Sequence, residues 1–316
     1  MTVMLESPGR GTIRARGVPP TARRGTAVKR HRLAAVGFLS PALVLILVFI
    51  AVPMVMTFWI SLHRWSMFTP ITDMDWVGLD NYRAVVTGST HLAALRNTVV
   101  YVALSAAITI PLAVLLALLL YVPRLRGRGL VRVILFATYV VPTVAIVIVW
   151  SNLYAPSYGP IDATLSALGV TSPGWLSNPS SALISLVIFN VWQMLGYYVV
   201  LLVAGLTQIP EEVYEAARID GAGPIRQTVS ITIPLLRNTL VFVFLMTVVN
   251  SIQVFDPVYL LTQGGPANST NVLSFDIQRT AFQNGLAGEA SALAFSLLIL
   301  LCLVAAVVSK GLRRRT

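Results

Sequence analysis

The sequence predicts an all-α membrane protein in which six transmembrane helices form a bundle and both termini lie in the cytoplasm. Composition, the spacing of apolar runs and the distribution of charge support this fold class. The 316 residues are 56% hydrophobic and 11% charged, with a mean hydropathy of +0.78. Soluble chains average about 45–50% apolar and about 25% charged residues. Soluble globular, disordered and disulfide-rich classes are therefore poor fits, because this chain lacks the charge that a water-facing surface needs.

Six apolar runs are long enough to cross a bilayer as helices, which takes about 20 residues each. They cover residues 33–62, 97–122, 133–154, 182–206, 236–261 and 290–309. Prolines lie within several runs, and helix bundles tolerate them because neighbouring groups satisfy the freed carbonyls. The first run follows an Arg-rich leader but exceeds the about 7–15 apolar residues of a secretory signal peptide. It is therefore predicted to remain as a span.

The basic residues predict the orientation of these spans. With the N-terminus inside, 19 of the 23 Lys and Arg residues fall in cytoplasmic segments and four fall outside. Basic residues accumulate in cytoplasmic loops, so the sequence places both termini in the cytoplasm. The chain is predicted to begin with a disordered basic tail that contacts anionic lipid (1–32) and to end with a second basic tail (310–316). Between them lies a transmembrane domain (33–309), which includes two outer segments (63–96 and 155–181) and a cytoplasmic loop (208–234).

No sequence signature of an enzyme or a cofactor site is present. Cys302 is the only cysteine, and the three histidines lack metal-ligand spacing. Neither lysine lies in a phosphate-binding GxxxxGK loop, so a partner must supply any nucleotide site. Basic residues punctuate the apolar runs instead of forming one face, which argues against a nucleic-acid partner. The sequence thus predicts a non-catalytic membrane subunit without catalytic residues, metal or other cofactor.

The cytoplasmic loop 208–234 contains the pattern of a short helix. Pro210 is suited to a helix start, and Glu211 and Glu212 then lie in the first turn, where the helix dipole favours anions. Gly221 and the following Ala-Gly-Pro stop this helix and turn the chain. A second amphipathic stretch then leads to the next span.

Two interpretations of this helix are open. It is either an amphipathic segment on the membrane surface or a helix that docks into a protein groove. Val213, Ala216 and Ala217 share one face, whose small side chains allow close approach of another backbone, and Glu215 and Arg218 flank it. The excess of carboxylates in the loop disfavours contact with anionic lipid, so docking is the favoured interpretation.

The loop also resembles a known motif. Its matching residues are Glu215, Ala216, Ala217, Asp220, Gly221, Ala222, Ile231 and Pro234. This pattern is similar to the EAA loop of ATP-binding-cassette importer permeases, although Ile225 and Thr228 stand where carbohydrate permeases often have bulky aromatics. The stretch 260–270, LLTQGGPANST, resembles the LTxGGPxxxT element of carbohydrate-type permeases. The resemblance covers about residues 33–310.

Membership of that family would imply the fold, the partners and the role of the loop. The implied fold is the type I importer permease bundle. The implied partners are a second permease subunit, cytoplasmic ATPase subunits, an extracytoplasmic solute-binding protein and a sugar or sugar-like solute. The loop would be the coupling helix that sits in a cleft of the ATPase. The implied coupling residues are Glu212, Glu215, Ala216, Ala217, Asp220, Gly221, Ala222 and Pro234.

Polar side chains recur at helical spacing in two spans and are candidates for the substrate pathway. They are Asn190, Gln193 and Tyr197 in the fourth span and Thr247, Asn250, Gln253 and Asp256 in the fifth. Polar groups in spans usually face a bundle interior or a cavity. The alternative is that they join helices, at about 0.6 kcal/mol each. With Asp256 the only acid in any span, a neutral carbohydrate is the favoured solute.

Other functions remain open at this point. A stand-alone secondary transporter or channel would work without an ATPase and would need no docking helix. A membrane-embedded enzyme is disfavoured because no nucleophile–base or metal constellation lies in or beside the spans. Export instead of import is disfavoured by the resemblance of the loop and of the GGP stretch.

Overall fold

The computed structural model describes residues 36–122 and 127–313 of the chain. These residues fall into two units, divided between Val55 and Met56. The predicted tail 1–32 lies outside the described residues. Of the predicted tail 310–316, residues 310–313 instead continue the last helix, and the rest lies outside the described range.

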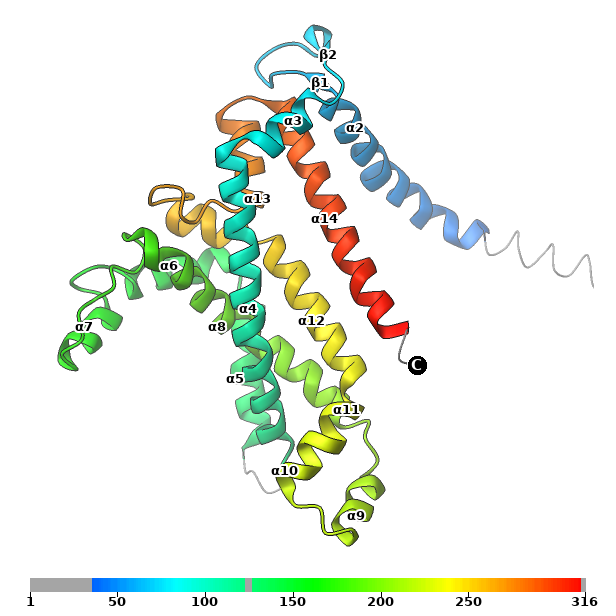
Figure 1. The fold of residues 1–316 in the computed structure, drawn as a ribbon, viewed down its shortest axis with the longest axis vertical. Coiled ribbons are helices and arrows are strands. Elements are labelled where there is room, and N and C mark those ends of the chain that lie inside the picture. Colours follow the sequence, from blue (N-terminus) through cyan, green and yellow to red (C-terminus); the bar gives the residue numbers. More distant parts are fainter. Residues whose placement is uncertain (1–35, 123–126, 314–316) are drawn as a thin grey trace, which may run out of the picture. The chain divides into compact units, whose positions relative to one another are not determined.

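The regular elements are helices, π-helical and 3₁₀ turns, and one small antiparallel strand pair (Figure 1). The α-helices are α2 (Val52–Ser61), α3 (Asp80–Thr87), α4 (Ser89–Tyr121), α5 (Arg128–Val140), α6 (Thr143–Leu153), α7 (Pro160–Ala167), α8 (Pro179–Leu206), α9 (Glu211–Ile219), α10 (Pro224–Gln227), α11 (Ile233–Leu235), α12 (Arg237–Ile252), α13 (Leu273–Gln278) and α14 (Ala287–Arg313). The other elements are η1 (Leu47–Ala51), β1 (His63–Arg64), η2 (Ile71–Asp73), β2 (Asp75–Trp76), η3 (Thr228–Thr232), η4 (Val258–Thr262) and η5 (Arg279–Gln283).

The predicted all-α membrane class is confirmed by helices of sufficient length and hydropathy. Within the described residues, four of them could each cross a membrane, namely Val36–Ser61, Ser89–Tyr121, Pro179–Leu206 and Ala287–Val308. Two bent pairs, Arg128–Val140 with Thr143–Leu153 and Pro224–Leu235 with Arg237–Ile252, bring the number to six if each pair counts as one span. The prediction of six spans agrees with this upper count.

The predicted third span, 133–154, is wrong as a single helix. It consists of α5 and α6, whose axes differ by 99° across the Val141–Pro142 break. Val141 is extended, with φ −69° and ψ 133°, because the ring of a following proline disfavours the helical conformation. The chain therefore turns sharply at this point.

The predicted fifth span, 236–261, is also wrong at its far end. The helix α12 stops at Ile252, and a new helical segment starts around Pro257 and continues into η4. Proline suits the first turn of a helix because its missing N–H is not needed there, but it would interrupt a helix running through. Gln253 therefore lies in the turn between the two helical segments, Asp256 begins the second segment, and both are exposed.

Two other prolines are accommodated by π-helical turns. A proline ring clashes with the carbonyl four residues before it, which is Phe49 for Pro53 and Ser230 for Pro234. Phe49 lies in η1 and Ser230 lies in η3. The wider turn relieves the clash while the helix continues. The expectation that the spans tolerate prolines is met here by a local change of helix type.

The centre of the second unit is the packing of α4 against α8 and α12 (Figure 1). One face of α4 is buried along most of its length and carries small or hydroxyl-bearing residues three or four positions apart. They are Ala94, Thr98, Tyr101, Ser105, Thr109, Ala113 and Ala117. Small side chains allow helix backbones to approach closely, which is how membrane helices pack without a hydrophobic driving force.

The start of α4 is tied to α13 and α14 by charged groups. His91 lies between two carboxylates, with its Nδ1 2.5 Å from Asp276 Oδ2 and its Nε2 2.6 Å from Glu289 Oε1. Arg279 Nη2 donates to Asp276 Oδ1 at 3.1 Å, and Asn271 Nδ2 donates to the same oxygen at 3.2 Å. This network holds three helices together at one end of the second unit.

The segment 155–181 folds around Asp162 of the short helix α7. Ser172 and the indole N–H of Trp175 each donate to Asp162 Oδ1 at 2.7 Å. The backbone N–H of Ser157 donates to the other oxygen at 3.4 Å. These hydrogen bonds, led by the Ser172 hydroxyl, hold the pKa of Asp162 below its ordinary value. The carboxylate therefore fixes this segment at neutral pH.

Candidate functional site

The helix α9 is formed by residues suited to their positions. Pro210 occupies the N-cap position, and Glu211 and Glu212 lie in the first turn. Arg218 lies in the last turn, where a cation complements the negative end of the helix dipole. The predicted start of the loop helix after Pro210 is confirmed by this element.

Gly221 ends α9 in a left-handed conformation, with φ +75°. The Ala222 N–H donates to the Ala217 carbonyl at 2.9 Å, and the Gly221 N–H donates to the Arg218 carbonyl at 3.1 Å. This pair of hydrogen bonds is the Schellman motif, which satisfies the last carbonyls of a helix. A Cβ at Gly221 would meet no atom within 4 Å, so glycine is favoured by its backbone angle and not by lack of space.

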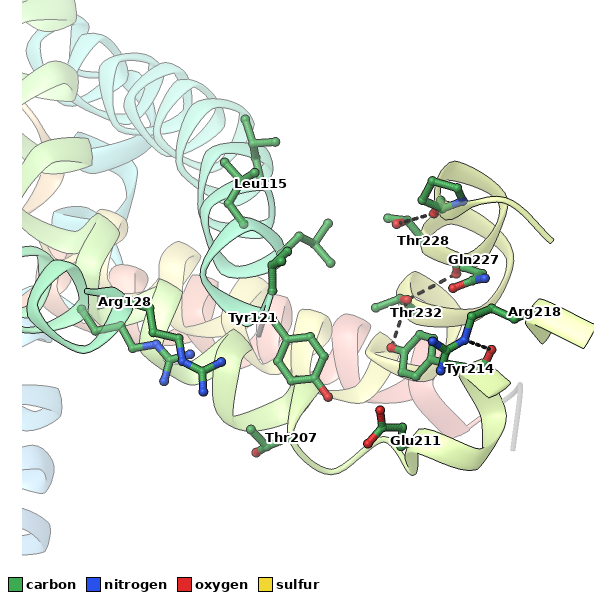
Figure 2. A pocket seen from close by; sticks show the side chains of 15 residues that line it. Leu115, Tyr121, Arg128, Thr207, Glu211, Tyr214, Arg218, Gln227, Thr228 and Thr232 are labelled. Carbon is green, nitrogen blue, oxygen red and sulfur yellow. Dashed lines mark hydrogen bonds between the residues drawn. The ribbon is translucent and has the colours of Figure 1, made fainter. Parts of the chain in front are cut away.

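The inner side of α9 is held against the following segment (Figure 2). Tyr214 and Thr232 share a hydrogen bond of 3.1 Å between their hydroxyls, and Ala217 is buried. The Gln227 side-chain amide donates to the Ala222 carbonyl at 2.6 Å. The loop is therefore a folded unit, because side chains of α9 and η3 hold its two halves together.

The outer side of α9 is not covered by any of the residues that the structure describes. Glu212, Glu215, Ala216 and Ile219 are all exposed and share one face at spacings of three and four residues. We call these four residues the exposed α9 face. The Ile219 side chain is 87% exposed, and Ile225 beyond the turn is 80% exposed. Large apolar side chains exposed between carboxylates are typical of a surface that a protein partner covers.

The small-residue face predicted for this helix is divided in the structure. Ala217 is buried within the chain, whereas Val213 and Ala216 are exposed. The prediction grouped the three by sequence spacing alone, and the contact between Tyr214 and Thr232 decides which of them turn inward. Pro234 lies in α11, at the end of the segment Pro224–Leu235 that meets α12 at 69°.

The polar residues of α8 contact α5 and α6 of the same chain. Gln193 is buried, and its amide donates to Thr143 Oγ1 at 2.9 Å. Tyr197 stacks on Tyr139, with 4.6 Å between the ring centroids. Asn190 is buried one turn from Gln193. The structure thus brings these residues together on one side of α8, as the spacing predicted, and gives two of them partners within the chain.

The polar residues of α12 differ in their surroundings. Thr247 is buried and donates to the Val243 carbonyl of its own helix at 2.8 Å. Asn250 is half-buried and donates from its side-chain amide to the Tyr198 hydroxyl of α8 at 3.1 Å. Asn250 therefore joins the two helices that carry the candidate pathway residues. Gln253 and Asp256 do not continue this stripe, because α12 ends before them.

A third set of polar residues, which was not predicted from the sequence, lies on α4. Tyr101, Ser105 and Thr109 are fully buried on the face of α4 described above. Their four-residue spacing, flanked by alanines at the same spacing, was a visible signal in the sequence. They place hydroxyl groups inside the bundle beside α8 and α12.

These features define the membrane-embedded component of a transport system, with polar groups between its helices and an exposed acidic helix on a loop. The chain belongs to the family described as "binding-protein-dependent transport system inner membrane component", which matches residues 109–316. It is thus a multi-pass inner-membrane protein, as predicted.

Individual relatives match most of the chain. It is 39% identical over 251 residues to the trehalose/maltose transport system permease protein MalF of Thermococcus litoralis, covering 79% of this chain and 84% of the relative. It is 30% identical over 308 residues to the diacetylchitobiose uptake system permease protein NgcF of Streptomyces coelicolor, covering 92% and 87%. A bacterial transporter that imports the polysaccharide alginate contains a chain of the same fold, with a TM-score of 0.79 at 22% identity and coverage of 92% and 98%.

Proposed function

We propose that the chain is a permease subunit of an ATP-driven, binding-protein-dependent importer of a sugar, and that the exposed α9 face couples it to the ATPase. The relatives named above are permeases for trehalose and maltose and for diacetylchitobiose. A chain of the same fold belongs to an alginate importer crystallised with its periplasmic binding protein. The partners are then a second permease, cytoplasmic ATPase subunits and a solute-binding protein. The chain itself is non-catalytic in this scheme.

The exposed α9 face is the observation that supports coupling most directly. It combines two carboxylates with a small residue and an isoleucine that is 87% exposed. A rigid helix with this surface suits a groove of a partner protein. The Schellman motif and the Tyr214–Thr232 contact make the helix rigid enough to transmit a displacement to α12. Both termini and this loop then lie in the cytoplasm, as the distribution of basic residues predicts.

Cross-linking tests this assignment. Cys302 is exposed and is first replaced by serine, and single cysteines are introduced as Glu215→Cys or Ile219→Cys. In the assembled complex, a short bifunctional reagent is expected to join either position to the ATPase subunit. Asp75→Cys, an exposed position on the far strand pair, is the matched control and is expected to give no such product. Labelling of Glu215→Cys in intact cells by a reagent that cannot cross the inner membrane would refute the proposed orientation.

We also propose that Asn190, Gln193, Tyr197, Thr247 and Asn250 line the route of the sugar. Amides and hydroxyls hydrogen-bond sugar hydroxyls, and aromatic rings stack on the CH faces of sugars. Trp192, the residue before Gln193 on α8, is 39% exposed, so the same stretch of helix also offers an aromatic ring. Helix–helix contact alone is the competing explanation for these groups.

Kinetics separate these two roles for Asn250. Asn250→Ala is expected to raise the KM for uptake of the transported sugar about two- to tenfold, since a lost hydrogen bond to a neutral group costs about 0.5–1.5 kcal/mol. Tyr198→Phe removes the intrachain partner of Asn250 and leaves its amide in place, so KM is expected to change far less. Uptake is measured in proteoliposomes, starting with maltose and trehalose. Equal effects of the two substitutions would show that Asn250 only joins helices.

A further inference from the structure

A pocket of about 700 Å³ lies between the loop and the ends of the neighbouring long helices (Figure 2). Its walls come from the end of α4, the start of α5, the end of α8, the inner side of α9 and the segment α10–η3. No residue of the exposed α9 face lines it, so the two surfaces are separate. The pocket is also separate from the polar residues of α8 and α12, none of which lines it.

The charges around this pocket favour an anion. Arg128 and Arg132 of α5 and Arg218 of α9 line it, and Glu211 is the one carboxylate among its lining residues. Figure 2 shows Arg128 and Arg218 approaching from opposite sides, with Glu211 beside Tyr121. Three guanidinium groups against one carboxylate leave an excess of positive charge. Guanidinium groups bind phosphate oxygens through paired hydrogen bonds.

Arg132 is held in place in the wall of this pocket. One of its terminal nitrogens, Nη2, donates to the Leu120 carbonyl at 2.8 Å, which fixes the side chain near the end of α4. Its Nε is buried and has no hydrogen-bond partner within residues 36–122 and 127–313. Because the Nε is inaccessible to solvent, Arg132 contributes to the pocket through its positive charge, which is spread over the whole guanidinium group.

The remaining wall is apolar and runs along α4. Leu115 and Leu119 are each 53% exposed and Val122 is 47% exposed, and all three line the pocket. Ile108, two turns before Leu115, continues the exposed apolar stripe along the helix. A basic end joined to an apolar stripe matches the two halves of a phospholipid, whose phosphate is charged and whose acyl chains are apolar.

We propose that this pocket binds an anionic phospholipid. The phosphate contacts Arg128, Arg132 and Arg218, and an acyl chain lies along the α4 stripe. This inference depends on the proposed function for its orientation, because that orientation places the pocket in the inner leaflet, where anionic headgroups bind basic pockets between membrane helices. The lipid bridges α5 and α9, so it stabilises the position of the coupling loop.

Native mass spectrometry of the purified complex tests the proposal. Wild type is expected to retain phosphatidylglycerol in preference to phosphatidylcholine. Arg128→Gln with Arg218→Gln is expected to weaken phosphatidylglycerol binding about tenfold or more, whereas Arg128→Lys with Arg218→Lys retains most of it. Both arginines are exposed, so these substitutions leave the fold intact. Glu211→Gln removes the opposing carboxylate and is expected to strengthen binding. Arg226→Gln, an exposed arginine outside the pocket, is the control.

Three outcomes would overturn the proposal. The first is equal retention of phosphatidylglycerol by wild type and the double Gln variant. The second is equal binding of both lipids. The third is a wild type that binds inorganic phosphate but shows no preference for phosphatidylglycerol, together with a double Gln variant that no longer binds phosphate. That result would assign the pocket to a soluble anion. Native mass spectrometry measures the lipid bound to the purified complex and does not depend on transport or on cross-linking. Failure of the lipid proposal is therefore distinguishable from failure of the cross-linking test of the proposed function.

Discussion

Replacing Gly196 with alanine is expected to separate α8 from α5 and to prevent the bundle from folding. A Cβ at this position would lie 1.8 Å from the Leu135 carbonyl oxygen and 2.2 Å from its carbon. Both atoms belong to the backbone of α5, so no side-chain rotation relieves the clash. Overpacking that side chains can absorb costs about 1–3 kcal/mol, and here a whole helix must move, so the cost is expected at or above the top of that range.

The loss would extend beyond the glycine itself. The contacts of Gln193 with Thr143 and of Tyr197 with Tyr139 both depend on the approach of α8 to α5 and α6. Gly196→Ala is therefore expected to lower the Tm of the detergent-purified protein by many degrees or to abolish its accumulation in membranes. Gly129→Ala is the matched control, because a Cβ there meets no atom within 4 Å. A wild-type Tm for Gly196→Ala would contradict the close packing of the two helices.

The sequence was sufficient to predict the long apolar helices α4 and α8 and the start and end of α9. Long apolar runs predicted α4 and α8, and Pro210 and Gly221 predicted the limits of the loop helix, because each acts through local backbone geometry. The orientation and the docking role come from charge and motif and remain proposals.

Breaks within the apolar runs were not predictable from hydropathy. Pro142 separates two helices at 99°, whereas Pro111 lies inside α4 without ending it. Both prolines stand in apolar surroundings, so the residue alone does not decide between a break and a continuous helix. The neighbouring helices decide, because they either satisfy the freed carbonyl or leave room for the chain to turn.

The faces of the site helices also depend on tertiary contacts. Spacing grouped Val213, Ala216 and Ala217, but the hydrogen bond between Tyr214 and Thr232 turns Ala217 inward and leaves Ala216 outward. Thr232 lies 18 residues after Tyr214, in a π-helical turn that was not predicted from the sequence. Periodicity predicted that α9 has two faces, and only the fold determines which one is free.

The substitution Glu215→Lys is expected to uncouple ATP hydrolysis from sugar uptake while leaving the permease folded. Glu215 is exposed at the centre of the exposed α9 face, so the bundle does not depend on it. In the proposed complex, reversing a charge at the centre of a docking surface costs about 2 kcal/mol or more, which corresponds to a loss of coupled uptake of more than about tenfold. In proteoliposomes, the ratio of sugar transported to ATP hydrolysed is the measurement.

Two further variants make this result specific to docking. Glu215→Gln keeps the shape and removes the charge, so uptake is expected between wild type and Glu215→Lys. Arg226→Glu is also a charge reversal at an exposed site of the same loop, but it lies outside the exposed α9 face and is expected to retain coupled uptake. If all three variants transport sugar equally well, the exposed α9 face does not couple ATP hydrolysis to uptake. If Arg226→Glu fails as completely as Glu215→Lys, the whole loop and not this face makes the contact.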